Sequence, residues 1–301
     1  MAKAKKSAVP SASALASKAM LVKLTFHCWR VTKTDRQVSS EVAQQHQAVE
    51  DAGSYRKKLM DYAVTSEISS AVTRLRAMRD FCTLPWEDGG WRILSAAKYF
   101  DFVKKVNAGR EEVMAAVEKF LADYPAHVAN EKKRQGSMFD ETQYPTADQI
   151  RSKYGVGVAF SKISDGEDIR IDVGEQELAK IRSSAKEAAQ ATLEAAVGDI
   201  WARLAAVVSK MVERLNAYAV TAEGKVQNSF RDSLVTNIED LLEVVPALNI
   251  TGDPAIDAFA AKIKAQLTAH SAEVLRDDEK VRKTVAAQAE DILAKMQAYL
   301  G

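Results

Sequence analysis

Hydrophobic residues recur at two different spacings along the chain. Near the N-terminus Val22, Leu24 and Phe26 alternate with polar residues, which is the pattern of a strand with one buried face. From residue 175 to about residue 218 the apolar positions instead repeat every three or four residues, with no proline and with Gly198 as the single glycine. The first pattern predicts a strand, and the second predicts a helix on the order of 65 Å long.

Three-and-four spacing predicts further helices between these two segments. They cover residues 35–62 and 68–78, as two helices or one long broken one, and residues from about 94 to 124. Pro85 and the glycine pair that follows it interrupt the pattern, and these residue types predict a turn between the second and third segments.

A β-hairpin is predicted within residues 154–174. Apolar side chains alternate in both halves, around Val158 and around Ile171, and Asp165-Gly166 between them suits a tight turn. Because a two-stranded hairpin is marginally stable by itself, we expect the N-terminal strand to join it in a small antiparallel sheet. Just before the hairpin, Thr146 and Gln149 have the spacing of a capping box, which predicts a short helix.

The C-terminal third is predicted to be helical throughout. Helices are expected over residues 226–245, from the Asp253-Pro254 cap to about residue 270, and over residues 272–300. The long helix cannot bury its apolar stripe alone, so a coiled coil or an elongated bundle is expected. The stripe is also the candidate interaction face, and it consists of Val197, Ile200, Leu204, Val208, Met211 and Leu215.

These elements predict an α+β protein that is predominantly α. A small antiparallel sheet, made by the N-terminal strand and the central hairpin and covered by helices, precedes a long coiled-coil-like bundle. The predicted division is a disordered basic tail over residues 1–20, a helical domain with the sheet over 21–174, and an elongated helical region over 175–301.

Composition and charge exclude several classes of protein. The chain has 301 residues, 47% of them hydrophobic, and its 42 lysines and arginines balance 41 acidic residues, so no overall charge draws it to nucleic acid or to a membrane. No apolar run has the roughly 20 residues that a membrane span requires. Cys28 and Cys82 are the only cysteines, which excludes a disulfide framework and indicates a reducing, cytoplasmic location.

Motifs for catalysis or metal binding do not occur in the sequence. The four histidines, at 27, 46, 127 and 270, lie in different predicted elements without partners at zinc-ligand spacing. Phosphate loops, nucleophile elbows and zincin motifs are also missing. We therefore expect a protein that is not an enzyme and has no cofactor; an enzyme that uses carboxylates brought together by folding stays open as an alternative.

Local positive charge marks one candidate site for nucleic acid. Lys132, Lys133, Arg134, Arg151 and Lys153 lie near several aromatic residues, and cations with rings suit single-stranded nucleic acid, where phosphates pair with the cations and bases stack on the rings. Acidic residues are interspersed among them, so a solvated surface is the competing interpretation.

The order of several short motifs resembles an uncharacterised family of phage- and plasmid-encoded helical proteins. The likeness is clearest over residues 20–185 and weaker across the C-terminal helices. The residues that carry it are Leu84-Pro85, Gly89-Gly90, Tyr124, Gly136, Phe139-Asp140, Tyr144-Pro145, Phe160, Ile169-Arg170, Leu275-Arg276 and Val281-Arg282.

Members of that family are often encoded near a AAA-type ATPase and a von Willebrand factor A-domain protein. The resemblance implies a protein partner, with this chain as scaffold or adaptor for an ATPase ring or as a self-associating oligomer in the bacterial cytoplasm. It carries over no catalytic residue. The alternative function is binding of single-stranded nucleic acid in phage DNA replication or repair.

Overall fold

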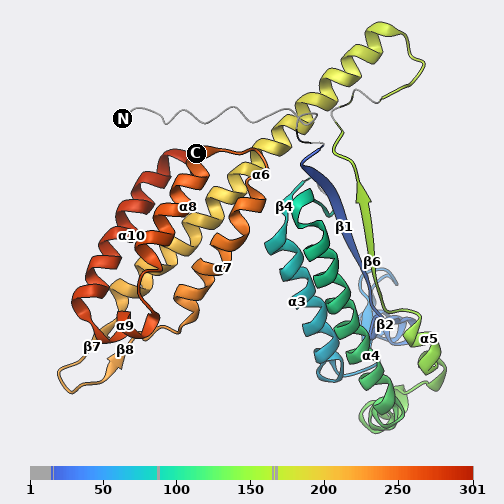
Figure 1. Ribbon diagram of the computed structural model, residues 1–301. Helices are drawn as coiled ribbons and strands as arrows, with labels where there is room; N and C mark the ends of the chain where they lie inside the picture. The colour runs from blue at the N-terminus through green and yellow to red at the C-terminus, as the bar shows by residue number, and fades with distance from the viewer. Residues whose placement is uncertain (1–14, 16, 87–88, 165, 167–168, 301) are drawn as a thin grey trace. The chain divides into compact units, whose positions relative to one another are not determined.

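The computed structural model describes residues 15, 17–86, 89–164, 166 and 169–300 (Figure 1). Contacts within the chain divide it into two compact units. Unit 1 comprises Met1–Lys23, Asp80–Phe100 and Ala159–Gly301, and unit 2 comprises Leu24–Arg79 and Asp101–Val158. This division differs from the predicted boundary at residue 174, because two segments that precede it group with the C-terminal helices.

A four-stranded antiparallel sheet has the strand order β4-β5-β1-β6. The predicted N-terminal strand is confirmed, and it pairs with β5 from Ala19 opposite Ser95 to Lys23 opposite Trp91. The turn between β4 and β5 contains Gly89 and Gly90, whose φ angles of 98° and 85° favour glycine. The strands are β1 (Ala19–His27), β4 (Leu84–Pro85), β5 (Trp91–Ser95) and β6 (Gly155–Ser161).

The predicted central hairpin is wrong in its second half. β6 forms as expected, but its neighbour in the sheet is β1, and residues 169–174 contain no strand. The Arg182 guanidinium instead donates a hydrogen bond to the carbonyl of Ile169, and Ile171 and Val173 are 47% and 45% exposed. Asp165 of the predicted turn lies outside the described residues, as does most of the predicted tail; within them Leu15 is buried.

A second sheet and a helix replace most of the helix predicted over residues 35–62. The sheet pairs β2 (Thr32–Asp35) with β3 (Tyr55–Lys58), and α2 (Arg36–Gln45) lies between them in the chain. Asp35 ends β2 and caps α2, because its carboxylate accepts from the backbone N–H of Val38 at 3.2 Å. β3 carries one buried residue, so alternation of hydrophobic residues gives no signal for it.

Two predicted helices are confirmed in unit 2, and both continue past their expected C-terminal ends, although the second begins at Tyr99 rather than near residue 94, which lies in β5. They are α3 (Ser66–Cys82) and α4 (Tyr99–Gln135), and α4 continues through Pro125. Gly109 of α4 faces Leu75 of α3, where a β-carbon would come within 2.6 Å of a leucine methyl group. The helices therefore pack closely because this position lacks a side chain. Between β5 and α4 lies a short 3-10 turn, Ala96–Lys98.

Short helical turns lead from α4 to β6. The predicted capping box is confirmed at α5 (Ala147–Arg151), where Thr146 and Gln149 exchange backbone and side-chain hydrogen bonds. Three further 3-10 turns in unit 2 cover Tyr62–Thr65, Gly136–Met138 and Glu141–Gln143.

The predicted long helix is confirmed as α6 (Glu175–Ala217), which runs along α7, α8 and α10 (Figure 1). Its first buried residue is Ala189, so its first turns extend beyond the other helices. The helix predicted over residues 226–245 begins later, because a small hairpin precedes it. It also continues past Pro246 to Leu248. The remaining elements are β7 (Ala219–Val220), β8 (Val226–Gln227), α7 (Ser233–Leu248), α8 (Pro254–Leu267), α9 (Ala272–Asp277) and α10 (Glu279–Leu300).

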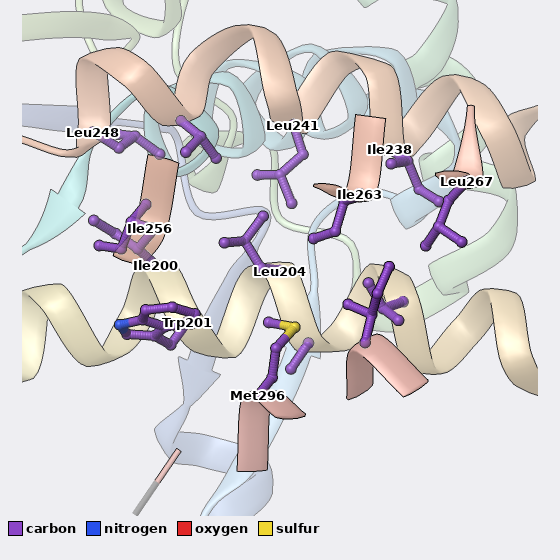
Figure 2. Close-up of a cluster of buried hydrophobic side chains, with 14 of the residues drawn as sticks. Ile200, Trp201, Leu204, Ile238, Leu241, Leu248, Ile256, Ile263, Leu267 and Met296 are labelled. Atoms are coloured by element: carbon purple, nitrogen blue, oxygen red, sulfur yellow. The ribbon is translucent and has the colours of Figure 1, made fainter. Parts of the chain in front are cut away.

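The core of the bundle contains most of the predicted interaction face. Leu204 is fully buried, and Figure 2 shows it between Leu241 of α7 and Met296 of α10. Trp201 stacks on Tyr299 at a ring distance of 4.3 Å. This corrects the sequence-based interpretation, because the stripe packs inside its own chain: Ile200, Leu204, Val208, Met211 and Leu215 are buried, and Val197 is partly buried.

Among the described residues, none of the helices combines the length and the apolar character that crossing a membrane requires.

Candidate polyanion-binding groove

An open groove lies in unit 2, where the chain leaves β1 and enters β2. Its volume is about 980 Å³. Residues 26–30, 32 and 33 form one part of its lining, Leu59 and Arg76 contribute further parts, and residues on either side of α5 complete it. Segments far apart in the sequence therefore meet at one surface.

A buried aromatic cluster supports the groove. Trp29 is 8% exposed, and its ring lies 6.2 Å from the rings of both Phe120 and Tyr124. The Tyr124 hydroxyl donates to the carbonyl oxygen of Pro145 at 2.9 Å, which joins α4 to the segment before α5. These contacts hold two sides of the groove in fixed positions.

The charged side chains that line the groove are all basic. Arg30, Lys33, Arg76 and Lys153 are exposed, and in the described part of the chain none of them forms an ion pair. None of the described lining residues is aspartate or glutamate. The groove therefore presents four uncompensated positive charges, together with the exposed imidazole of His27.

One of these cations is also part of a stacked pair. The Arg76 guanidinium lies over the Phe26 ring, 4.7 Å from its centroid. A cation above an aromatic face is attracted by the ring quadrupole, so this contact orients Arg76 without neutralising it. The pair combines positive charge with flat surfaces.

A smaller cavity of about 360 Å³ adjoins the groove and extends along α3. It shares Cys28, Trp29, Arg30, Thr32 and Arg76 with the groove, and its described lining again includes no carboxylate. Two of the four cations, Arg30 and Arg76, thus line both hollows.

Burial keeps the Cys28 thiol and the Tyr154 hydroxyl protonated near neutral pH. Burial raises the pKa of the Cys28 thiol, while the charge of Arg76 opposes the change. Burial also raises the pKa of Tyr154 to about 12. A protonated thiol is a poor nucleophile, so the site favours binding through hydrogen bonds and charge.

The structure separates the five residues predicted to contact nucleic acid. Lys153 lines the groove. Arg151 instead pairs with Glu118 at 2.7 Å and with Asp148, and the pKa of the Glu118 carboxyl falls mainly because it accepts a hydrogen bond from Arg151. Arg134 lies 2.6 Å from the carboxylate of Glu131, which raises the pKa of the arginine.

The two remaining predicted residues, Lys132 and Lys133, are exposed near the end of α4. They do not line the groove. The Lys132 ammonium lies 5.9 Å from the centroid of the Phe139 ring. Of the predicted patch, only Lys153 therefore belongs to the groove.

Three groove cations were missed in the sequence. Arg30 and Lys33 lie just after the predicted strand, where a basic, tryptophan-containing stretch is a visible signal. Arg76 lies on a helix more than 40 positions later, and nothing in its neighbourhood distinguishes it from any exposed arginine. Its place in the groove follows from the packing of α3.

The described residues contain no group of three or more histidine, cysteine or acidic side chains arranged to hold a metal ion.

The chain matches no family model, no curated protein and no solved structure. The geometry and charge of its own surfaces are therefore the basis for a functional proposal.

Proposed function

We propose that this protein binds single-stranded nucleic acid through the groove of unit 2. The observation that carries the proposal is the set of four uncompensated cations, Arg30, Lys33, Arg76 and Lys153, in a hollow without carboxylates. Nucleic-acid affinity comes mostly from cations that neutralise phosphates and release counterions. The whole chain is nearly neutral, so this concentration of charge is local.

The aromatic content of the groove favours a single strand over a duplex. Unstacked bases bind to aromatic rings and to the planar guanidinium of arginine. The stacked pair of Arg76 and Phe26 offers both kinds of surface at one place. A duplex would present only its phosphates there, because its bases are paired and stacked.

The volume of the groove also suits a chain of nucleotides. At about 980 Å³ it lies at the upper end of the roughly 300–1,000 Å³ that small-molecule sites occupy. We propose binding without turnover, in the replication or repair of phage DNA that the sequence analysis gave as the alternative function.

Fluorescence anisotropy with a short labelled single strand tests the proposal. The groove variant, which combines Arg30→Gln, Lys33→Gln, Arg76→Gln and Lys153→Gln, should lose most of the affinity at moderate salt. The side chains are exposed, so the variant should fold, and circular dichroism checks this. A duplex of the same length should bind more weakly than the single strand.

The control variant combines Lys132→Gln and Lys133→Gln. It removes two exposed cations from the same unit that do not line the groove, so it should retain most of the wild-type affinity. Equal losses of single-strand affinity in the two variants would show that the nucleic acid contacts a surface other than the groove. Unchanged binding in a folded groove variant would contradict the proposal directly.

A second candidate function is a protein contact, as in the adaptor role that the resemblance implies. One observation favours it: Ile171, Val173 and Ile181 are 47%, 45% and 37% exposed around the start of α6. Exposed apolar groups that lie together are typical of interaction surfaces. We propose self-association through this segment as the form of contact that the protein alone can show.

Light scattering over a range of concentrations tests this second candidate. The wild type should form a defined oligomer, and a variant with Ile171→Ser, Val173→Ser and Ile181→Ser should be monomeric. A wild type that stays monomeric at every concentration would argue against self-association through this segment.

A further inference from the structure

A second basic hollow lies in unit 1, where the last turns of α6 meet the start of α7. Its volume is about 310 Å³. Lys210 and Arg214 reach it from α6, and Arg231 reaches it from the segment before α7. Ser229, Ser233 and Asn237 add hydroxyl and amide groups to the lining.

Positive charge exceeds negative charge at this cavity. The ammonium of Lys210 lies 3.0 Å and the guanidinium of Arg214 lies 3.7 Å from the carboxylate of Glu213, so the two cations share one carboxylate. Arg231 forms no ion pair in the described part of the chain. The nearby Asp232 is paired with Arg276 at 3.0 Å.

The cavity walls are fixed before any ligand binds. Phe230 lines the cavity and is 5% exposed, and its ring lies 5.4 Å from that of Tyr218. Arg276 donates to the carbonyl of Phe230 at 3.0 Å. Val207 and Leu234 provide further apolar wall. A rigid apolar wall beside basic and hydroxyl groups suits a ligand with one anionic and one apolar end.

We propose that this cavity binds a small phosphorylated molecule, such as a phosphomonoester with a compact organic group. Arginine and lysine are the usual partners of phosphate oxygens, and serine and asparagine donate neutral hydrogen bonds to them. At about 310 Å³ the cavity is at the lower end for a ligand site, which favours a small molecule over a polymer. The proposal is independent of the groove in unit 2.

Isothermal titration calorimetry with two probes, inorganic pyrophosphate and adenosine 5′-monophosphate, tests the proposal on the full chain. At least one probe should bind with one site per chain. The cavity variant, Lys210→Gln with Arg231→Gln, should weaken that binding about tenfold or more, because two charge-assisted hydrogen bonds are lost. Both side chains are exposed enough for the variant to fold, which circular dichroism verifies.

Two control variants locate the site. Lys264→Gln removes an exposed cation of unit 1 away from the cavity and should leave the affinity unchanged. The groove variant of unit 2 should also bind the probe normally. Failure of both probes to bind, unchanged binding in the cavity variant, or loss of binding in the groove variant would overturn the proposal. None of these results depends on whether a single strand binds the groove.

Discussion

Replacing Leu204 with alanine should destabilise the helical bundle strongly. Leu204 is fully buried, and helices α7 and α10 pack on either side of it (Figure 2). Leucine-to-alanine changes in cores cost about 3–5 kcal/mol, with larger costs where the surroundings cannot close the cavity. Three helices joined by short connections surround α6, so little collapse is expected, and we expect a loss of about 3–4 kcal/mol.

Val197→Ala is the matched control on the same helix. Val197 belongs to the same sequence stripe but is partly buried, so its loss should cost about 1 kcal/mol. The difference between the stability losses of the two variants distinguishes a stripe that forms the core of the bundle from a stripe that forms an oligomer interface.

Hydrogen exchange measured by mass spectrometry follows both variants. Because the chain has two units, exchange of individual peptides is more informative than one global unfolding curve. Leu204→Ala should accelerate exchange in the buried turns of α6 and in α10 by roughly 100- to 1,000-fold. Peptides of α4 in unit 2 serve as the internal reference. The reasoning is refuted if Leu204→Ala costs no more than Val197→Ala and dissociates an oligomer instead.

Three further predictions concern single sites. Glu131→Gln should cost unit 2 about 1–3 kcal/mol, because the buried carboxylate accepts from the backbone N–H of Asp61 and from Arg134; exchange at the end of α4 should accelerate. Asp253→Ala removes the cap of α8 and should cost about 1 kcal/mol, seen as a lower urea midpoint. Burial raises the pKa of Tyr124 and Tyr154 to about 12, so the folded state keeps protons that the unfolded chain releases near pH 10. Their contribution to stability is complete below about pH 10 and is lost as the pH rises towards 12, which denaturation at increasing pH should show; constant stability across that window would contradict it.

Local signals predicted several helix starts well, although the helix expected over residues 272–300 is divided at Asp278 into α9 and α10. The start of α6 follows Gly174, and the start of α8 is marked by an aspartate cap followed by proline. The capping box at Thr146 likewise identified α5. Each of these features involves residues within a few positions of one another, so the sequence contains the whole interaction.

Strand pairing was harder to predict because the partners are distant in sequence. The alternation around Ile171 is as regular as that of β6, yet β6 lies beside β1, and the later segment contacts α6 through Arg182. β3 carries too little apolar character to be recognised, although β2 pairs with it. Alternation shows that a segment can be a strand, and packing decides whether it becomes one.

The candidate site was predicted only in part for the same reason. A run of basic residues is visible in the sequence, but whether each cation is free depends on carboxylates that are brought near by folding. Glu118 lies on α4, more than 30 positions from Arg151, and neutralises it. Arg76 enters the groove from α3. The composition of the groove therefore follows from tertiary structure.

The salt dependence of single-strand binding reports whether the four groove cations contact phosphates. For single strands, each neutralised phosphate contributes about −0.7 to the slope of log affinity against log salt concentration. If Arg30, Lys33, Arg76 and Lys153 each contact a phosphate, the wild-type slope should be about −3. The groove variant should show a slope near zero. A wild-type slope near zero, or equal slopes for wild type and the groove variant, would contradict the account.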